Sequence, residues 1–148
     1  MVEPKTDVQR LAAQMQKEGK SVITLILKQK YFNAILAGRK VQEFREVRPT
    51  TYKRLILHDA DGFDIEDENG MAQPIHYDAI LFYAGYNTNR DSALVEVKDA
   101  YVQYFVDEND KIIEYQADDG VYWQASQVVY NLGKILCTDL HHQDILNV

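Results

Sequence analysis

Three patterns of apolar and polar positions follow one another between residues 21 and 48. Residues 22–27 form an almost unbroken apolar run rich in β-branched side chains, which predicts a buried strand. Apolar side chains then recur at helical spacing over residues 31–36, and Gly38 is positioned to end that helix. From Lys40 the polarity alternates as in a strand, up to Pro49. The stretch therefore predicts a strand, a helix and a second strand.

Similar patterns place the other elements. Residues 6–17 carry one apolar stripe with Thr6 or Asp7 as the helix cap, and Thr50 or Thr51 can cap a short helix that reaches Leu55. Hairpin turns are predicted at residues 107–110 and 118–120. Strands are predicted at residues 77–84, 93–97, 101–106, 112–115, 121–123 and 128–140, the last interrupted at Asn131 and Gly133. This succession predicts an α+β fold with a mixed or antiparallel sheet, curled into a β-barrel with flanking helices.

Composition limits the classes of function. The chain has 148 residues, which is typical of one domain, and we expect residues 1–20 to form a helical extension packed on a domain of residues 21–148. A net charge of −7 argues against non-specific binding of duplex DNA. The single Cys137 excludes an internal disulfide. The sequence has no apolar run of membrane-spanning length and no signal-peptide pattern at Met1, so we expect a cytoplasmic protein that does not bind membranes.

The charged residues of the second strand are the first candidates for a site. Glu43 and Arg45 share one face of this strand, and Lys40 precedes them after the helix stop. One interpretation is a polar cleft lined by all three side chains. The other is an ion pair between Glu43 and Arg45 on a solvated strand. Lys40 and Glu43 are three residues apart, so they converge only if Lys40 lies in the turn or the strand bends.

The loop of residues 85–92 is longer than a tight hairpin requires, and it is polar after Tyr86. Asn87, Asn89 and Arg90 can bond a ligand, and Tyr86 can stack on a base. Asn side chains also cap turns by bonding their own backbone, so an ordinary turn explains the loop equally well.

Three further features are weaker candidates. Glu96 alternates with Val95 and Val97, and as a strand carboxylate it is either a general base or a partner of Lys98. The acidic loop of residues 59–70 lacks the spacing of a calcium loop and is typical of a solvated excursion. Adjacent histidines such as His141 and His142 rarely share one ion, so we expect neither a metal site nor a cofactor.

The first stretch resembles a known family. The residues Tyr31-Phe32-x-x-Ile35-Leu36-x-Gly38-x-Lys40-x-x-Glu43-x-Arg45 are similar to the signature of ASCH domains, the activating-signal-cointegrator homology family. The signature covers about a fifth of the chain. The resemblance implies the PUA-like fold, a compact β-barrel with flanking helices, and a role near RNA or modified nucleosides.

The resemblance implies two functions of different classes. One is a binding module that holds RNA, a nucleoside or a nucleotide around Lys40, Glu43 and Arg45. The other is a small amidohydrolase that deacylates N(4)-acetylcytidine. In that branch the catalytic set is a Lys after Gly-x, a Thr three residues later and a Glu further on. Lys40 matches the lysine, Glu43 stands where the threonine would be, and Glu96 is a candidate for the glutamate. The oligomeric state is left open.

Overall fold

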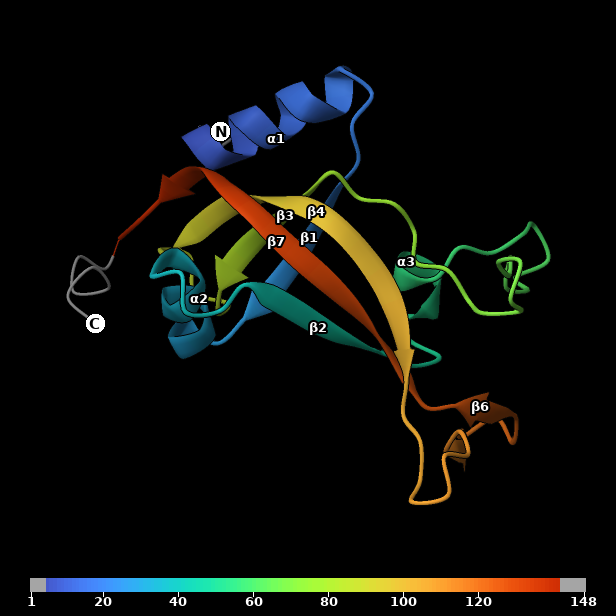
Figure 1. Cartoon of the computed structure of the whole chain (residues 1–148). Coiled ribbons are helices and arrows are strands. Elements are labelled where there is room, and N and C mark those ends of the chain that lie inside the picture. Colours follow the sequence, from blue (N-terminus) through green and yellow to red (C-terminus); the bar gives the residue numbers. More distant parts are fainter. Residues whose placement is uncertain (1–4, 142–148) are drawn as a thin grey trace. The chain divides into compact units, whose positions relative to one another are not determined.

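The computed structural model describes residues 5–141 of the chain, and most of the predicted elements are present in it (Figure 1). Within this range, none of the helices combines the length and the hydropathy that a membrane span requires. In chain order the elements are α1 (Asp7–Lys17), β1 (Val22–Leu27), α2 (Gln29–Leu36), β2 (Gln42–Val47), α3 (Tyr52–Leu55), β3 (Ala79–Ala84), β4 (Ser92–Tyr104), β5 (Glu114–Gln116), β6 (Tyr122–Gln124) and β7 (Ser126–Asp139).

Five of the strands form one mixed sheet in the order β1-β3-β4-β7-β2, and β5 pairs with β6. β1 runs parallel to β3, with Val22 opposite Ala79, whereas β3 and β4 are antiparallel, with Ile80 opposite Val95. The predicted α+β class with a mixed sheet is confirmed, and a closed barrel is not shown. The predicted interruption of the last strand is wrong, because β7 continues through Asn131 and Gly133.

The chain forms two compact units. Among the described residues, unit 1 comprises residues 5–42, 77–98 and 131–141, and unit 2 comprises residues 43–76 and 99–130. The long strands β4 and β7 each contribute residues to both units. The predicted division into an extension of residues 1–20 and a domain of residues 21–148 stays a prediction.

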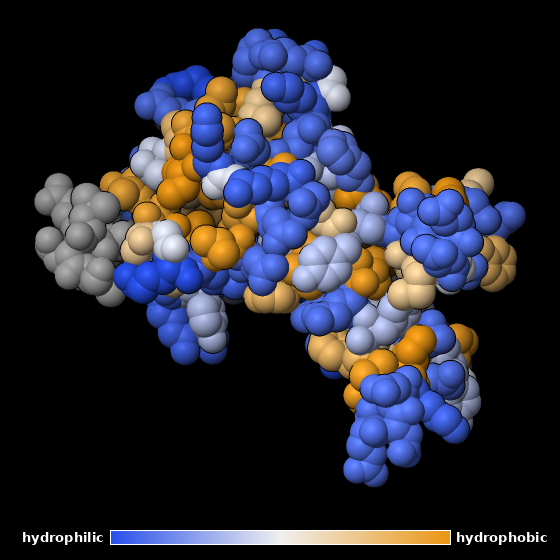
Figure 2. Space-filling model, viewed as in Figure 1, coloured by the Kyte–Doolittle hydropathy of each residue, from blue (hydrophilic) through white to orange (hydrophobic). Residues whose placement is uncertain are grey.

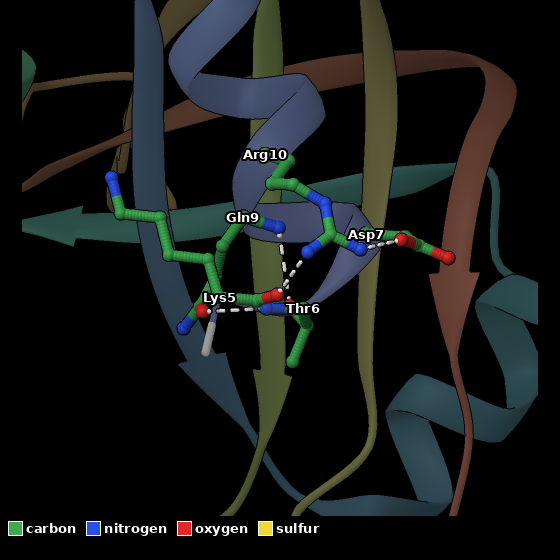
Figure 3. Close-up of polar contacts among 5 residues, drawn as sticks. All are labelled: Lys5, Thr6, Asp7, Gln9 and Arg10. Carbon is green, nitrogen blue, oxygen red and sulfur yellow. Dashed lines mark hydrogen bonds and ion pairs between the residues drawn. The ribbon is translucent and has the colours of Figure 1, made fainter. Parts of the chain in front are cut away.

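In unit 1, helix α1 begins with a capping box at Thr6 (Figure 3). Gln9 donates its backbone N–H to Thr6 Oγ1 at 3.2 Å, and the Gln9 side chain accepts the backbone N–H of Thr6 at 3.0 Å. Arg10 adds an ion pair with Asp7 and a hydrogen bond to the Lys5 carbonyl at 2.8 Å. The two bonds of the capping box satisfy backbone N–H groups at the start of the helix that would otherwise have no partner.

The apolar stripe of α1 packs on the sheet of unit 1. Val8, Ala12 and Met15 are buried in one cluster with side chains of β3 and β4, namely Ala79, Leu81 and Leu94. Burying side chains of the size of Val or Met contributes about 1.5–3 kcal/mol each. The cluster includes Leu94, so it fixes the part of β4 in which Glu96 lies.

Helix α2 ends as the sequence predicts. Gly38 has a φ of 76°, and its N–H donates to the Ile35 carbonyl at 3.1 Å. The N–H of Arg39 donates to the Ala34 carbonyl at 2.9 Å, which completes a Schellman motif. Only a residue without a Cβ takes this backbone angle without strain, so Gly38 fixes where the chain turns toward Lys40.

Unit 2 contains α3, the β5–β6 hairpin and an ordered acidic loop. Two aspartates organise the loop by accepting backbone N–H groups. Asp59 Oδ1 accepts from Asp61 and Phe63, and Asp67 Oδ1 accepts from Asn69 and Met71, all at 2.8–3.0 Å. These are Asx-type turns. The loop is thus built from turns in which the carboxylates of Asp59 and Asp67 are held by backbone N–H groups.

Candidate functional site

Lys40 lies in the turn after α2, which is one of the two alternatives that the sequence left open. Its N–H donates to the Ala34 carbonyl at 3.1 Å, and β2 begins two residues later. Lys40 lines a hollow of about 400 Å³ in unit 1, which we call the Lys40 hollow. The described residues around it are mostly apolar, with one further lysine: Ile35, Leu36, Val41, Val95, Leu132, Ile135 and Lys134.

The ring of Tyr31 lies beside two lysine side chains of unit 1. Lys30 Nζ is 4.9 Å from the ring centroid and Lys40 Nζ is 5.9 Å from it. Tyr31 is 44% exposed, so part of the ring remains open to solvent. Both separations are within the range of cation–π attraction. The result is an exposed aromatic face within a group of positive charges, in a chain that carries a net charge of −7.

Glu43 and Arg45 of unit 2 pair with each other on β2. Arg45 Nη2 donates to Glu43 Oε2 at 3.1 Å, and Glu43 Oε1 accepts the N–H of Phe44 at 3.0 Å. The residue Glu43 is only 6% exposed, so the pair is not a solvated one. The Arg45 side chain is 28% exposed. The carboxylate therefore holds a guanidinium that remains partly accessible.

Glu96 lies in a different hollow of unit 1 from Lys40. It lines a space of about 610 Å³ together with Leu11 and Met15 of α1 and with Lys98. Its neighbour Val95 lines the Lys40 hollow with residues of α2. Successive strand residues point to opposite faces, so α1 and α2 cover opposite faces of β4 (Figure 1). The structure thus separates Glu96 from Lys40 and places it beside Lys98, the alternative partner.

The polar loop after β3 divides into exposed and anchored residues. Tyr86 is 83% exposed, and Asn87 and Asn89 are exposed as well. Arg90 stacks on Tyr83, with its guanidinium carbon 3.8 Å from the ring centroid, and Nη1 donates to the Gly85 carbonyl at 3.2 Å. Arg90 therefore anchors the loop, while the other three side chains extend from it.

The sequence analysis missed the buried carboxylate of this loop. Asp91 is fully buried. It accepts Gln29 Nε2 at 2.9 Å and the N–H of His141 at 2.6 Å, which ties the start of α2 and the end of the described chain to the loop. A charged residue next to a turn carries no local signal of burial, so only tertiary contacts identify it.

Unit 2 contains an aromatic hollow of about 560 Å³ that the sequence analysis also missed. We call it the Trp123 hollow. Its walls include five aromatic rings and two carboxylates, from Tyr52, Phe63, Tyr104, Tyr122, Trp123, Asp64 and Glu66. In Figure 2, hydrophobic residues reach the surface among hydrophilic ones along the segment that follows α3, where Phe63 is 72% exposed. Sequence periodicity assigned these residues to separate loops and strands.

Tyr52 connects the aromatic and the acidic walls of this hollow. Its hydroxyl donates to Asp64, and its ring meets Trp123 edge to face with 5.5 Å between the centroids. Burial raises the pKa of Tyr52 well above its ordinary value, and the hydrogen bond to Asp64 and the nearby charges of Asp64 and Asp59 raise it further.

The indole N–H of Trp123 has no hydrogen-bond partner among the described residues, although the atom is buried. Leaving such a donor unpaired costs about 1–3 kcal/mol. Native proteins retain few such groups, and each one calls for an explanation, such as a functional role. Trp123 thus packs against Tyr52 while its N–H stays unpaired among the described residues.

No group of three metal-binding side chains occurs in residues 5–141. His141 Nε2 lies 3.5 Å from Asp139 Oδ2, and His142 falls outside the described residues. Comparison with protein-family models, with curated proteins and with solved structures finds no match to this chain. The ASCH resemblance therefore rests on the residues between Tyr31 and Arg45 alone.

Proposed function

We propose that this chain is a PUA-like ASCH-type domain that binds a nucleotide or a short single-stranded RNA, with the Lys40 hollow as the main binding site. The observation that carries the proposal is the lining of this hollow, where two lysines meet an apolar surface of unit 1. A nucleotide has the matching parts, because its phosphate is anionic and its base and sugar offer flat and apolar faces.

Lys40 and Lys134 supply the anion-binding half of the site. An ammonium group binds phosphate as a compact charge with three N–H donors. Tyr31, flanked by Lys30 and Lys40, offers a ring on which a base can stack. The apolar side chains of Ile35 and Leu132 favour contact with a base or a sugar over a bare inorganic ion.

Arg45 lies in unit 2 and stays a separate candidate for contact with a ligand. Its guanidinium is oriented by Glu43, and guanidinium groups bind phosphate and base edges through paired donors. Glu43 acts in this proposal as a positioning residue for Arg45. The loop after β3 offers further candidate contacts in its exposed side chains, namely Tyr86, Asn87 and Asn89. Arg90 already contacts the Tyr83 ring and the Gly85 carbonyl.

The lining of the Lys40 hollow favours binding over hydrolysis. Amide hydrolysis by the family's route requires a carboxylate close to Lys40. Among the described unit 1 residues that line this hollow, none is Asp or Glu, and Glu96 lines another one. The deacylase alternative therefore has less support from this unit than the binding module.

Calorimetric titration with nucleoside monophosphates and with short single-stranded RNAs tests the proposal. Lys40→Ala and Lys134→Ala should each weaken binding about tenfold, because each removes a charged hydrogen bond to phosphate. Lys111→Ala removes the same charge from an exposed turn of unit 2 and should leave the affinity unchanged. Affinity should also fall as salt rises.

Two results would reject this function. One is the absence of heat and of thermal stabilisation with every nucleotide and RNA at concentrations up to about 10 mM, which corresponds to an affinity too weak for a specific site. The other is an affinity that Lys40→Ala, Lys134→Ala and Lys111→Ala change equally, since a general charge effect and not a site would then explain the binding.

A further inference from the structure

The Trp123 hollow has a chemistry opposite to that of the Lys40 hollow. Its described lining contains no Lys, Arg or His, but it contains the carboxylates of Asp64 and Glu66. Five aromatic rings surround the same space. Aromatic faces and carboxylates both attract positive charge, whereas phosphate would meet two like charges here. The site therefore suits a different ligand from that of the proposed nucleotide site.

The two carboxylates have accepting capacity left for a ligand. Asp64 accepts one hydrogen bond from the Tyr52 hydroxyl, and a carboxylate has room for several. Glu66 makes no hydrogen bond or ion pair with any other described residue. The backbone near Asp64 is held by the turn at Asp59, which accepts the N–H of Phe63 at 3.0 Å. Asp64 is thus placed by the fold, and both carboxylates can still accept hydrogen bonds.

The aromatic walls favour a flat cation. Tyr52 and Trp123 pack edge to face, so they present faces in different directions, and Phe63 and Tyr122 are largely exposed. A guanidinium group stacks on aromatic faces and is weakly hydrated, and its N–H donors match the geometry of carboxylates. A quaternary ammonium has no N–H donors and would add no hydrogen bond to either carboxylate. A volume of about 560 Å³ holds more than the guanidinium itself, so room remains for the body that carries it.

We propose that the Trp123 hollow binds the guanidinium group of an arginine or of an arginine-like small molecule, between its aromatic walls and the carboxylates of Glu66 and Asp64. The chemistry is shared by a free small molecule and by an arginine side chain of a peptide. The site lies wholly in unit 2 and does not depend on the proposed nucleotide site.

The chain offers a direct readout of this site. Trp123 is its only tryptophan, so fluorescence excited selectively in tryptophan reports on this hollow alone. The full chain is titrated with L-arginine, with a capped Gly-Arg-Gly tripeptide, with L-citrulline and with choline. Citrulline keeps the shape of arginine without its charge. Arginine or the tripeptide should change the emission with saturation, and citrulline and choline should bind at least about tenfold more weakly.

A matched pair of variants tests the carboxylate. Glu66→Gln should weaken arginine binding about tenfold, because it removes the charge that faces the ligand. Glu68→Gln removes an equal charge from the same loop outside the lining and should change nothing. Circular dichroism and unfolding of both variants establish that they are folded.

The outcomes separate the two sources and can overturn the site. Saturable binding of the tripeptide at least as tight as that of arginine identifies a peptide ligand, and binding of arginine alone identifies a small molecule. The proposal is overturned if neither changes the emission at up to about 10 mM. It is also overturned if citrulline or choline binds as tightly as arginine, or if Glu66→Gln and Glu68→Gln behave alike. None of these results depends on whether nucleotides bind at Lys40.

Discussion

Gly133 on β7 lies so close to Glu96 on β4 that a Cβ atom added to Gly133 would be 2.4 Å from Glu96 Oε1. The same atom would be 3.2 Å from Cδ and 3.3 Å from Cβ of Glu96. The approach of this side chain limits the space at Gly133, and a special backbone angle plays no part. The close approach accounts for a glycine within β7, at a position where the sequence pattern predicted an interruption.

Gly133→Ala should therefore destabilise the protein by about 1–2 kcal/mol, because Glu96 must leave its place and strain the strand around it. Urea unfolding of the variant measures this free energy. In the background of Glu96→Ala, the same substitution should cost much less, so the two changes should not be additive. Equal costs in both backgrounds would show that Glu96 is not the obstacle.

Asp91 should be a major contributor to the stability of unit 1. Asp91→Ala leaves the Gln29 side chain and the His141 N–H without their buried acceptor, and we expect a loss of about 3 kcal/mol. Asp61→Ala removes an exposed aspartate side chain and should stay within about 0.5 kcal/mol of the wild type. Thermal and urea unfolding compare the two variants, and similar stabilities would contradict the role of Asp91.

The single thiol should react slowly near neutral pH. Burial raises the pKa of Cys137, and the negative charge of Asp7 raises it further, so little thiolate forms. Asp7→Asn removes that charge and should speed alkylation about twofold at pH 8, whereas Asp61→Asn should not. Mass spectrometry follows the rate without ambiguity, because the chain has one cysteine. An unchanged or slower rate in Asp7→Asn would refute this electrostatic link.

Tyr52 should make stability depend on alkaline pH. Its folded-state pKa is raised by burial first and then by the hydrogen bond to Asp64, so the neutral phenol is favoured in the native state. The contribution is complete below the unfolded pKa of about 10 and is lost as pH rises above it. Tyr52→Phe should be less stable than the wild type by about 1 kcal/mol below that pH, with a smaller difference above it.

The matched control for Tyr52 is Tyr122→Phe, which alters a largely exposed tyrosine of the same unit. The difference in stability between Tyr122→Phe and the wild type should not shrink as the pH rises. Urea unfolding at neutral and alkaline pH measures both variants. A difference between Tyr52→Phe and the wild type that grows with pH would have the wrong sign for a raised pKa.

N(4)-acetylcytidine should be recovered unchanged after incubation with the protein. The Lys40 hollow has no carboxylate among its described unit 1 lining, so the catalytic set that the resemblance implies is incomplete there. Mass spectrometry with the protein in excess gives the answer, with Lys40→Ala in parallel. Release of acetate by the wild type alone would establish the deacylase instead and make Glu43 and then Glu96 the next residues to substitute.

Local signals determined most of the elements. The cap at Thr6, the stop at Gly38 and the apolar run of β1 each act within a few residues, so the sequence by itself located α1, α2 and the strand between them. It also determined that Lys40 follows the helix stop. Of the two alternatives that the sequence left open, a bent strand or a place in the turn, Lys40 takes the turn.

Tertiary structure decided which side chains share a space. Lys134 lines the same hollow as Lys40, although the two residues are far apart in the sequence. Glu66 and Trp123 likewise line one hollow from distant segments. Neither pair leaves a local pattern in the sequence. Glu43 shows the same limit, because strand alternation gives its face but only packing determines that it is buried. Periodicity is set by backbone geometry within one element, whereas burial and the composition of a site depend on residues that folding brings together from distant parts of the chain.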